Sequence, residues 1–323
     1  MSMHPDVVEI VERIRKDEIG GAADTAKEVI DALAAMVRDS EAKDSAALVV
    51  EIDDAVLEIM RVMPSLAPPI NAIHQFVSRV EVEQEEGLGL DEMKAALINT
   101  RDQFFAWAEN ALDKVAQHGA EKILDGDRIF MYSMSSTVWR IFKVAKEQGK
   151  QFEVVVTESR PGNEGLWTVT EMDKLGIPVS VSIDACIGEL IPGCDAVFVG
   201  ADVISATGHA LCKMGTYPSA LVAKASGTPF YIAADTLKFD TGTLIGLPYR
   251  NESIHRHEVL DDSYPKEAVV VGHLFDETPP ELVTAIITEV GILHPAAAFT
   301  VLQQMNPSKK LSEMLPAWSK GEL

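Results

Sequence analysis

Several short apolar runs in the second half of the chain are each followed by side chains that can do chemistry. If these runs are parallel strands, their carboxyl ends meet at one edge of a sheet, which is where such sheets bind ligands. Hydroxyl, carboxylate and cationic groups would then gather at that edge. The residues selected in this way are Ser133, Ser135, Ser136, Thr157, Glu158, Ser159, Arg160, Gly162, Asp184, Asp202, Asp235, Thr236 and Lys238.

Three hydroxyl residues, Ser135, Ser136 and Thr137, come directly before the helical stretch Val138–Ala145. Free backbone amides at a helix N-terminus attract anions, and hydroxyl groups can add to them. The pattern therefore predicts a phosphate site. An ordinary helix cap is the alternative interpretation of the same residues.

Three cations and one carboxylate complete the candidate set. The planar guanidinium of Arg160 suits a bidentate contact with phosphate, and Lys213 and Lys238 could supply further positive charge. Asp202 follows an apolar run and begins an expected loop that closes with Gly208. A carboxylate there can cap a helix or move a proton, and its position alone leaves both roles open.

Two patterns of apolar residues divide the chain. Residues 1–124 show helical spacing, whereas short runs rich in β-branched and aromatic residues alternate with helical stretches from about residue 125. We therefore expect an α/β protein in which a helical N-terminal domain, 1–124, precedes a Rossmann-like parallel-sheet domain, 125–323, that carries the ligand site. The expected strands are Arg128–Ser133, Glu153–Thr157, Pro178–Ile183, Ala196–Gly200, Pro229–Ala233 and Ala268–Val271.

Segments outside the expected sheet carry their own predictions. The prolines within 64–69 mark a loop, and the glutamates within 81–86 indicate a solvated face or turn. His255 and His257 lie on a polar loop and are expected to be solvated rather than to bind metal. The tail Asn306–Leu323 is expected to fray.

The charge balance excludes whole classes of partner. The sequence has 28 Lys and Arg against 50 Asp and Glu, a net charge of −22, which disfavours binding to nucleic acid or an anionic membrane surface. No apolar run of about 18 residues is present, and the N-terminus lacks the apolar core of a signal peptide. These observations predict a cytoplasmic protein.

The composition and motifs also limit the chemistry. Cys186, Cys194 and Cys212 form no CxxC pair, so we expect reduced thiols in the core. The GxGxxG and GxxxxGK[ST] loops are absent. We expect neither a cofactor nor a metal.

Ordered motifs in the second half resemble those of a known family. They are Val156-Thr-Glu-Ser-Arg-Pro161, Ile183-Asp-Ala185, Val199-Gly-Ala-Asp202, Lys213-Met-Gly-Thr216, Pro229-Phe-Tyr-Ile-Ala-Ala-Asp-Thr-Leu-Lys-Phe239, Phe275-Asp-Glu-Thr-Pro-Pro280 and Ile287-Thr-Glu289. Together they resemble the translation initiation factor 2B alpha/beta/delta family, which includes ribose-1,5-bisphosphate isomerase and is related to methylthioribose-1-phosphate isomerase.

The resemblance implies specific roles for individual residues. The isomerases convert an aldose 1-phosphate to a ketose phosphate, and their catalytic cysteine and aspartate fall on Ser133 and Asp202. The residues expected to hold phosphate or sugar oxygens are Gly21, Ala22, Ser135, Arg160, Lys213 and Lys238.

Four positions depart from the family pattern. Ser133 replaces the cysteine, and a hydroxyl is far less acidic than a thiol. Gly20 and Met63 stand where arginines are expected, and Cys212 replaces an asparagine. Loss of two arginines makes one bound phosphate a better expectation than two.

Three interpretations follow from these similarities and departures. The first is a sugar-phosphate aldose–ketose isomerase resembling ribose-1,5-bisphosphate isomerase, with a changed substrate as one option. The second is a non-catalytic subunit that senses a sugar phosphate or nucleotide, resembling initiation factor 2B alpha, which also lacks the cysteine. A structural paralogue that binds no ligand is a third. The resemblance also implies a homo-oligomer, either a dimer or a hexamer.

Overall fold

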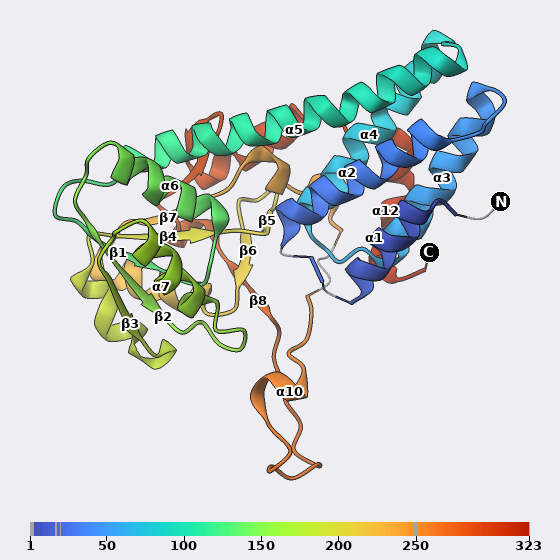
Figure 1. The fold of residues 1–323 in the computed structure, drawn as a ribbon. Coiled ribbons are helices and arrows are strands. Elements are labelled where there is room, and N and C mark those ends of the chain that lie inside the picture. The colour runs from blue at the N-terminus through green and yellow to red at the C-terminus, as the bar shows by residue number, and fades with distance from the viewer. Residues whose placement is uncertain (1–2, 17, 20, 248–250, 323) are drawn as a thin grey trace. The chain divides into compact units, whose positions relative to one another are not determined.

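A computed structural model describes residues 3–16, 18, 19, 21–247 and 251–322 (Figure 1). The chain forms two compact units, and each contains more than one segment. We call Met1–Asn110, Leu237–Arg250 and Thr300–Leu323 the helical unit, and Ala111–Thr236 with Asn251–Phe299 the α/β unit. The domain boundary after residue 124 stays a prediction; the division between these units falls inside a long helix.

The first part of the chain is helical, as its apolar spacing predicts. Its apolar residues recur every three to four positions, so each helix has one face that packs into a core. The helices are α1 Pro5–Arg15, α2 Ala22–Asp39, α3 Ser45–Val62, α4 Ala67–Glu86 and α5 Leu90–Ala120. The predicted proline loop is shorter than expected, because Pro68 and Pro69 lie in the first turn of α4, where a missing N–H is tolerated.

The C-terminal tail is not frayed, so that prediction is wrong. Residues Lys309–Lys320 form helix α12, and Ser308 caps it by accepting a hydrogen bond from the Leu311 N–H. Leu311, Leu315 and Trp318 are buried in the core of the helical unit. The spacing of these apolar residues places them on one face, which explains why this segment packs.

The α/β unit contains a seven-stranded sheet in the order β10-β9-β7-β4-β1-β2-β3, which confirms the predicted parallel-sheet fold. Its strands are parallel except for β10, which pairs with β9 in the antiparallel direction. The strands are β1 Arg128–Met131, β2 Glu153–Thr157, β3 Val179–Ser182, β4 Ala196–Gly200, β7 Phe230–Ala233, β9 Ala285–Thr288 and β10 Gly291–Leu293.

A second, antiparallel sheet lies in the same unit and was not predicted. It consists of β5 Val203–Ile204, β6 Ala210–Lys213 and β8 Phe275–Thr278. Asp202 therefore leads into a hairpin strand rather than into a simple loop. The remaining helices of this unit are α6 Ser136–Glu147, α7 Glu164–Lys174, α8 Ile187–Leu190, α9 Thr216–Ser226 and α10 Arg256–Val259; α11, Ala298–Gln303, precedes α12 and spans the division between the units.

The predicted strand at Ala268–Val271 is wrong. This segment has no strand structure, and the side chains of Val269 and Val271 are each 82% exposed. It belongs to an arm, residues 252–274, that carries α10 and extends away from the sheet of the α/β unit (Figure 1). The arm begins and ends as a short antiparallel ribbon, with Ser253 opposite His273. Apolar β-branched residues without a neighbouring strand or a covering layer do not form a strand.

Candidate active site

The order of the strands places the candidate site. Chain connections run outward from β1 toward β2 and β3 on one side, and from β4 toward β7 and β9 on the other. The crevice of such a sheet lies where this direction reverses, between β1 and β4. Ser133 and Ser135 follow β1, and Asp202 follows β4. Three of the predicted residues therefore follow the two strands that flank the switch point.

Ser133 is held in an unusual backbone conformation. Its φ is 61°, in the left-handed region that non-glycine residues rarely adopt. Its N–H donates to Ser159 Oγ over 2.9 Å, and its carbonyl accepts from Thr168 Oγ1 over 3.2 Å. These contacts tie the end of β1 to the loop after β2 and to α7. Strain fixed in this way is typical of functional sites.

Asp184 organises the loop after β2. Its carboxylate accepts from the N–H groups of Ser159 and Arg160 over 2.9 and 2.8 Å. The side chain of Arg160 is exposed, and its Nη2 donates to the carbonyl of Glu258 in α10. Arg160, which the sequence predicts to bind phosphate, therefore contacts the arm.

Ser135 is the N-cap of α6, which agrees with the interpretation of this segment as an ordinary helix cap. Its hydroxyl accepts from the Val138 N–H over 3.3 Å. A Cβ atom at Gly200, the last residue of β4, would stand 2.5 Å from Ser135 Oγ. The glycine therefore lets the loops after β1 and β4 touch directly.

Asp202 is half-buried two residues beyond that contact. Its N–H donates to the carbonyl of Leu211 over 2.9 Å, which starts the pairing of β5 with β6. The backbone at this aspartate is thus fixed by both sheets. This position suits a carboxylate that must meet a substrate in a defined orientation.

Lys213, at the end of β6, forms an ion pair with Glu164 at the start of α7. Lys213 Nζ and Glu164 Oε1 are 2.5 Å apart, and the two side chains are 16% and 19% exposed. The positive charge of Lys213, which the sequence predicts for phosphate binding, is therefore partly balanced by the carboxylate of Glu164.

The turn after Lys213 is held by Asp276, in β8. The Asp276 carboxylate accepts from the N–H of Gly215 over 2.6 Å and from that of Tyr217 over 3.1 Å, at the N-terminus of α9. Burial raises the pKa of Asp276 to about 6, and the backbone hydrogen bonds oppose this rise. Burial, and then the charges of nearby carboxylates, raise the pKa of Tyr132, which lies beside Gly215.

Three predicted binding residues belong to the helical unit. Ala22 is the first residue of α2, and Gly21, with a φ of 127°, is its N-cap; Lys238 is buried at the end of a short 3₁₀ helix. Asn71 Nδ2 holds the segment around Lys238 by donating to the carbonyls of Leu237 and Phe239. The roles of these three residues stay predictions. Gly20, where the family has an arginine, lies outside the described residues.

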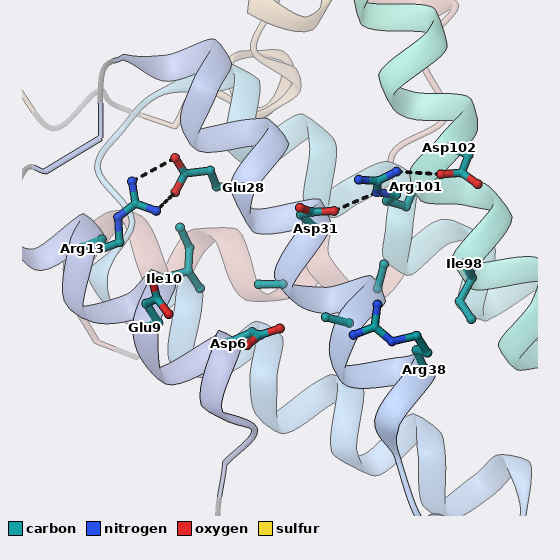
Figure 2. A pocket seen from close by; sticks show the side chains of 13 residues that line it. Asp6, Glu9, Ile10, Arg13, Glu28, Asp31, Arg38, Ile98, Arg101 and Asp102 are labelled. Atoms are coloured by element: carbon teal, nitrogen blue, oxygen red, sulfur yellow. Dashed lines mark hydrogen bonds and ion pairs between the residues drawn. The ribbon is translucent and has the colours of Figure 1, made fainter.

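A cleft of about 500 Å³ lies among α1, α2 and α5 in the helical unit (Figure 2). Its three arginines already face carboxylates: Arg13 pairs with Glu28, Arg38 with Asp39, and Arg101 with Asp31 and Asp102. Asp6 and Glu9 add further negative charge to the lining. An anionic sugar fits this cleft poorly, so the sheet edge remains the candidate site.

Other sequence predictions can be placed within the described chain. His255 and His257 are exposed and stack on each other, and no group of three or more potential metal ligands occurs among the described residues. Cys186, Cys194 and Cys212 are free thiols; Cys194 and Cys212 are buried, and Cys186 is half-buried. None of the described helices is both long and apolar enough to cross a membrane.

Glu164 and Asp276 contact residues of the candidate site, and the sequence did not single them out. Both lie in or next to the quoted motifs, Glu164 three residues after Pro161 and Asp276 within Phe275–Pro280. The signal was therefore present, but their partners, Lys213 and Gly215, come from other parts of the chain.

Comparison with known proteins identifies the family. Residues 18–295 match the Initiation factor 2 subunit family, and the chain belongs to it, which confirms the resemblance of the motifs. The ribose 1,5-bisphosphate isomerase of Pyrococcus furiosus is 33% identical over 303 residues, 93% of this chain and 94% of that protein.

Solved structures show the same fold. A translation initiation factor eIF-2B from Pyrococcus horikoshii OT3 is 31% identical, with a TM-score of 0.75, and the match covers 90% of this chain and 98% of that one. The 5-methylthioribose 1-phosphate isomerase from Pyrococcus horikoshii OT3 is 24% identical, with a TM-score of 0.75 over 93% and 88% of the two chains.

Proposed function

We propose that this protein is a sugar-phosphate isomerase that converts an aldose 1-phosphate to a ketose phosphate. The observation that supports this proposal is that Ser133 and Asp202 follow β1 and β4, the two neighbouring strands at the switch point of the sheet. The similarity to a ribose 1,5-bisphosphate isomerase over 93% of the chain supports it.

Asp202 serves as the general acid and base in this proposal. Ring opening places a proton on the ring oxygen, a hydrogen moves from the second carbon to the first, and the hydroxyl on the second carbon loses its proton. These changes balance without an oxidant or reductant, because one proton is given and one is taken back. The Ser133 hydroxyl occupies the partner position, and Lys213 and Ser135 hold phosphate or sugar oxygens.

A specific observation favours a second candidate, a subunit that binds a sugar phosphate or nucleotide without converting it. Ser133 lacks the acidity of a thiol, and the contacts given above are made by its backbone N–H and carbonyl rather than by its hydroxyl. The 31% identical structure bears the name of an initiation factor rather than an enzyme.

The finer assignments belong to the same proposal. We infer that the protein works in the cytoplasm and assembles with copies of itself as a dimer or hexamer. The exposed apolar side chains of the arm, including Val259, Tyr264, Val269 and Val271, support assembly because a partner surface would cover them.

Turnover decides between the two candidates. Purified protein is incubated with ribose 1,5-bisphosphate and with other aldose 1-phosphates, and ketose formation is followed over time. The isomerase proposal expects a ketose product, with the rate reduced by a factor of about 10² or more in Asp202→Asn. Absence of product, together with a rise in melting temperature on adding a sugar phosphate or nucleotide, would establish the binding subunit instead.

A further inference from the structure

Lys213, a cation that the sequence predicts to contact phosphate, already forms an ion pair with Glu164. Oε1 of Glu164 accepts the hydrogen bond from Lys213, while Oε2 is buried and has no hydrogen-bond partner in the described chain. A buried carboxylate oxygen without a donor is costly. The carboxylate therefore holds Lys213 through the hydrogen bond to Oε1 and leaves a negative charge beside it.

The backbone around Glu164 is shaped to keep this carboxylate in place. A Cβ atom at Gly162 would stand 2.4 Å from Glu164 Oε1, so a side chain there would displace the carboxylate. Glu164 is the first residue of α7, where the positive end of the helix dipole favours an anion. The helix start thus stabilises the negative charge of Glu164.

Glu164 also belongs to the face of α7 that meets the candidate site. Thr168 lies one helical turn further on, and residues four apart share a face. Thr168 Oγ1 donates to the Ser133 carbonyl, and a Cβ atom at Gly165 would stand 1.7 Å from the carbonyl oxygen of Thr157. This end of α7 therefore packs directly on the loops after β1 and β2.

We propose that Glu164 is a specificity-determining residue that limits how much negative charge the site accepts at Lys213. This inference rests on the proposed sugar-phosphate site. Lys213 has three N–H donors and can contact a phosphate while it keeps Glu164 as a partner. The approaching phosphate is then repelled by the neighbouring carboxylate, so a highly charged substrate binds less tightly than Lys213 alone would allow.

The alternative role for Glu164 is to hold the Lys213 side chain in position. The two roles predict different effects of Glu164→Gln on phosphate binding. In Glu164→Gln the side-chain carbonyl can still accept from Lys213, but the negative charge is gone. A charge-limiting residue predicts tighter binding of phosphate in this variant, whereas a support predicts unchanged or weaker binding.

Inorganic phosphate is the probe, and its dissociation constant is measured by calorimetry at low ionic strength. We expect Glu164→Gln to bind phosphate about tenfold more tightly than the natural protein. The double variant Glu164→Gln/Lys213→Gln should lose that gain. Glu171→Gln is the matched control, since Glu171 pairs with Lys174 on the same helix at 2.6 Å, and it should leave the constant unchanged.

Unchanged or weaker phosphate binding in Glu164→Gln, or absence of binding in both proteins, overturns the inference. A gain that persists in the double variant overturns it as well. Turnover separates this result from the proposed function: if no variant forms a ketose but Glu164→Gln shows the Lys213-dependent gain, the role of Glu164 stands and the isomerase fails. If turnover occurs, the same variant should lower KM with little change in kcat.

Discussion

Gly215 lies against Tyr132 so closely that a Cβ atom at position 215 would stand 2.0 Å from the tyrosine hydroxyl oxygen. Tyr132 follows β1 of the main sheet, and Gly215 follows β6 of the small one. The contact therefore fixes the turn after Lys213 against the residue that precedes Ser133. It sets the spacing between the hydroxyl and cationic parts of the candidate site.

Replacement of Gly215 by alanine should be strongly destabilising. The new methyl group meets the Tyr132 ring, and the φ of 107° is unfavourable for alanine. We expect the free energy of unfolding, measured with urea, to fall by about 3 kcal/mol or more.

Gly227→Ala, at the other end of α9, is the control for this variant. Its φ is 76°, but nothing lies within 4 Å of the added atom, so only the backbone cost of about 1–2 kcal/mol should remain. Equal losses in the two variants would contradict the role of the Tyr132 contact.

Ser133→Cys should increase isomerase activity. A thiol is more acidic and more easily deprotonated than a hydroxyl, and sulfur replaces oxygen without a change in the backbone. We expect kcat for an aldose 1-phosphate to rise by a factor of about ten, while Ser133→Ala should show no gain. A cysteine variant that is no faster than the natural protein would show that this position does not limit the reaction.

Asp276 should make stability depend on pH in a defined direction. Its pKa is raised by burial from 3.8 to about 6, so the folded state binds more protons than the unfolded state between these values. The contribution of this group to stability is present below pH 3.8 and is lost as the pH rises through about 6. With about 1.36 kcal/mol for each pKa unit, the loss is up to about 3 kcal/mol.

Asp276→Asn tests this prediction. The amide oxygen can still accept the Gly215 and Tyr217 N–H groups but does not titrate. The stability of the natural protein relative to the variant, from urea unfolding at several pH values, should decrease from pH 4 to pH 6 and then become constant. A difference that is independent of pH would be incompatible with a buried, titrating Asp276.

His74, in the helical unit, should act in the opposite direction. Burial lowers its pKa from 6.5 to about 4, and neither ring nitrogen has a hydrogen-bond partner in the described chain. The unfolded state then takes up the proton first, so stability is lost as the pH falls from 6.5 toward 4, by up to about 3 kcal/mol. His74→Leu should remove this loss, and a variant as acid-sensitive as the natural protein would refute it.

The sheet was predictable because its signal is local. Five of the six expected runs, short and rich in β-branched and aromatic residues, are strands of the main sheet, whereas its strands β9 and β10 were not predicted. Ala268–Val271 has the same composition but no partner, and Val269 is left exposed. Whether an apolar run pairs depends on distant parts of the chain, which composition does not reveal.

The candidate site was predictable in position but not in its contacts. The rule of strand ends selected Ser133, Ser135 and Asp202, which the order of the sheet brings to one switch point. Lys213 was predicted as a cation for phosphate, but its partner Glu164 lies 49 positions away. Such pairs depend on which loops pack together. Sequence patterns therefore identified Lys213 as a cation but not the carboxylate that pairs with it.

The glutamates within 81–86 also make contacts that their sequence pattern did not predict. Glu85 and Glu86 are exposed, as expected, but Glu83 is fully buried beside Arg79. Glu81 accepts from the Ser308 hydroxyl and the Lys310 N–H and so holds the start of α12. A run of charges predicts solvation only where no later segment of the chain returns to cover it.

The participation of α12 in the helical core has a consequence for synthesis on the ribosome. Leu311, Leu315 and Trp318 are made more than two hundred residues after the α4 helix that they help to cover. Until they emerge, the first four helices expose an incomplete apolar face, which favours aggregation of the nascent chain. The segments of the α/β unit are all translated before that point, so this unit can finish folding first.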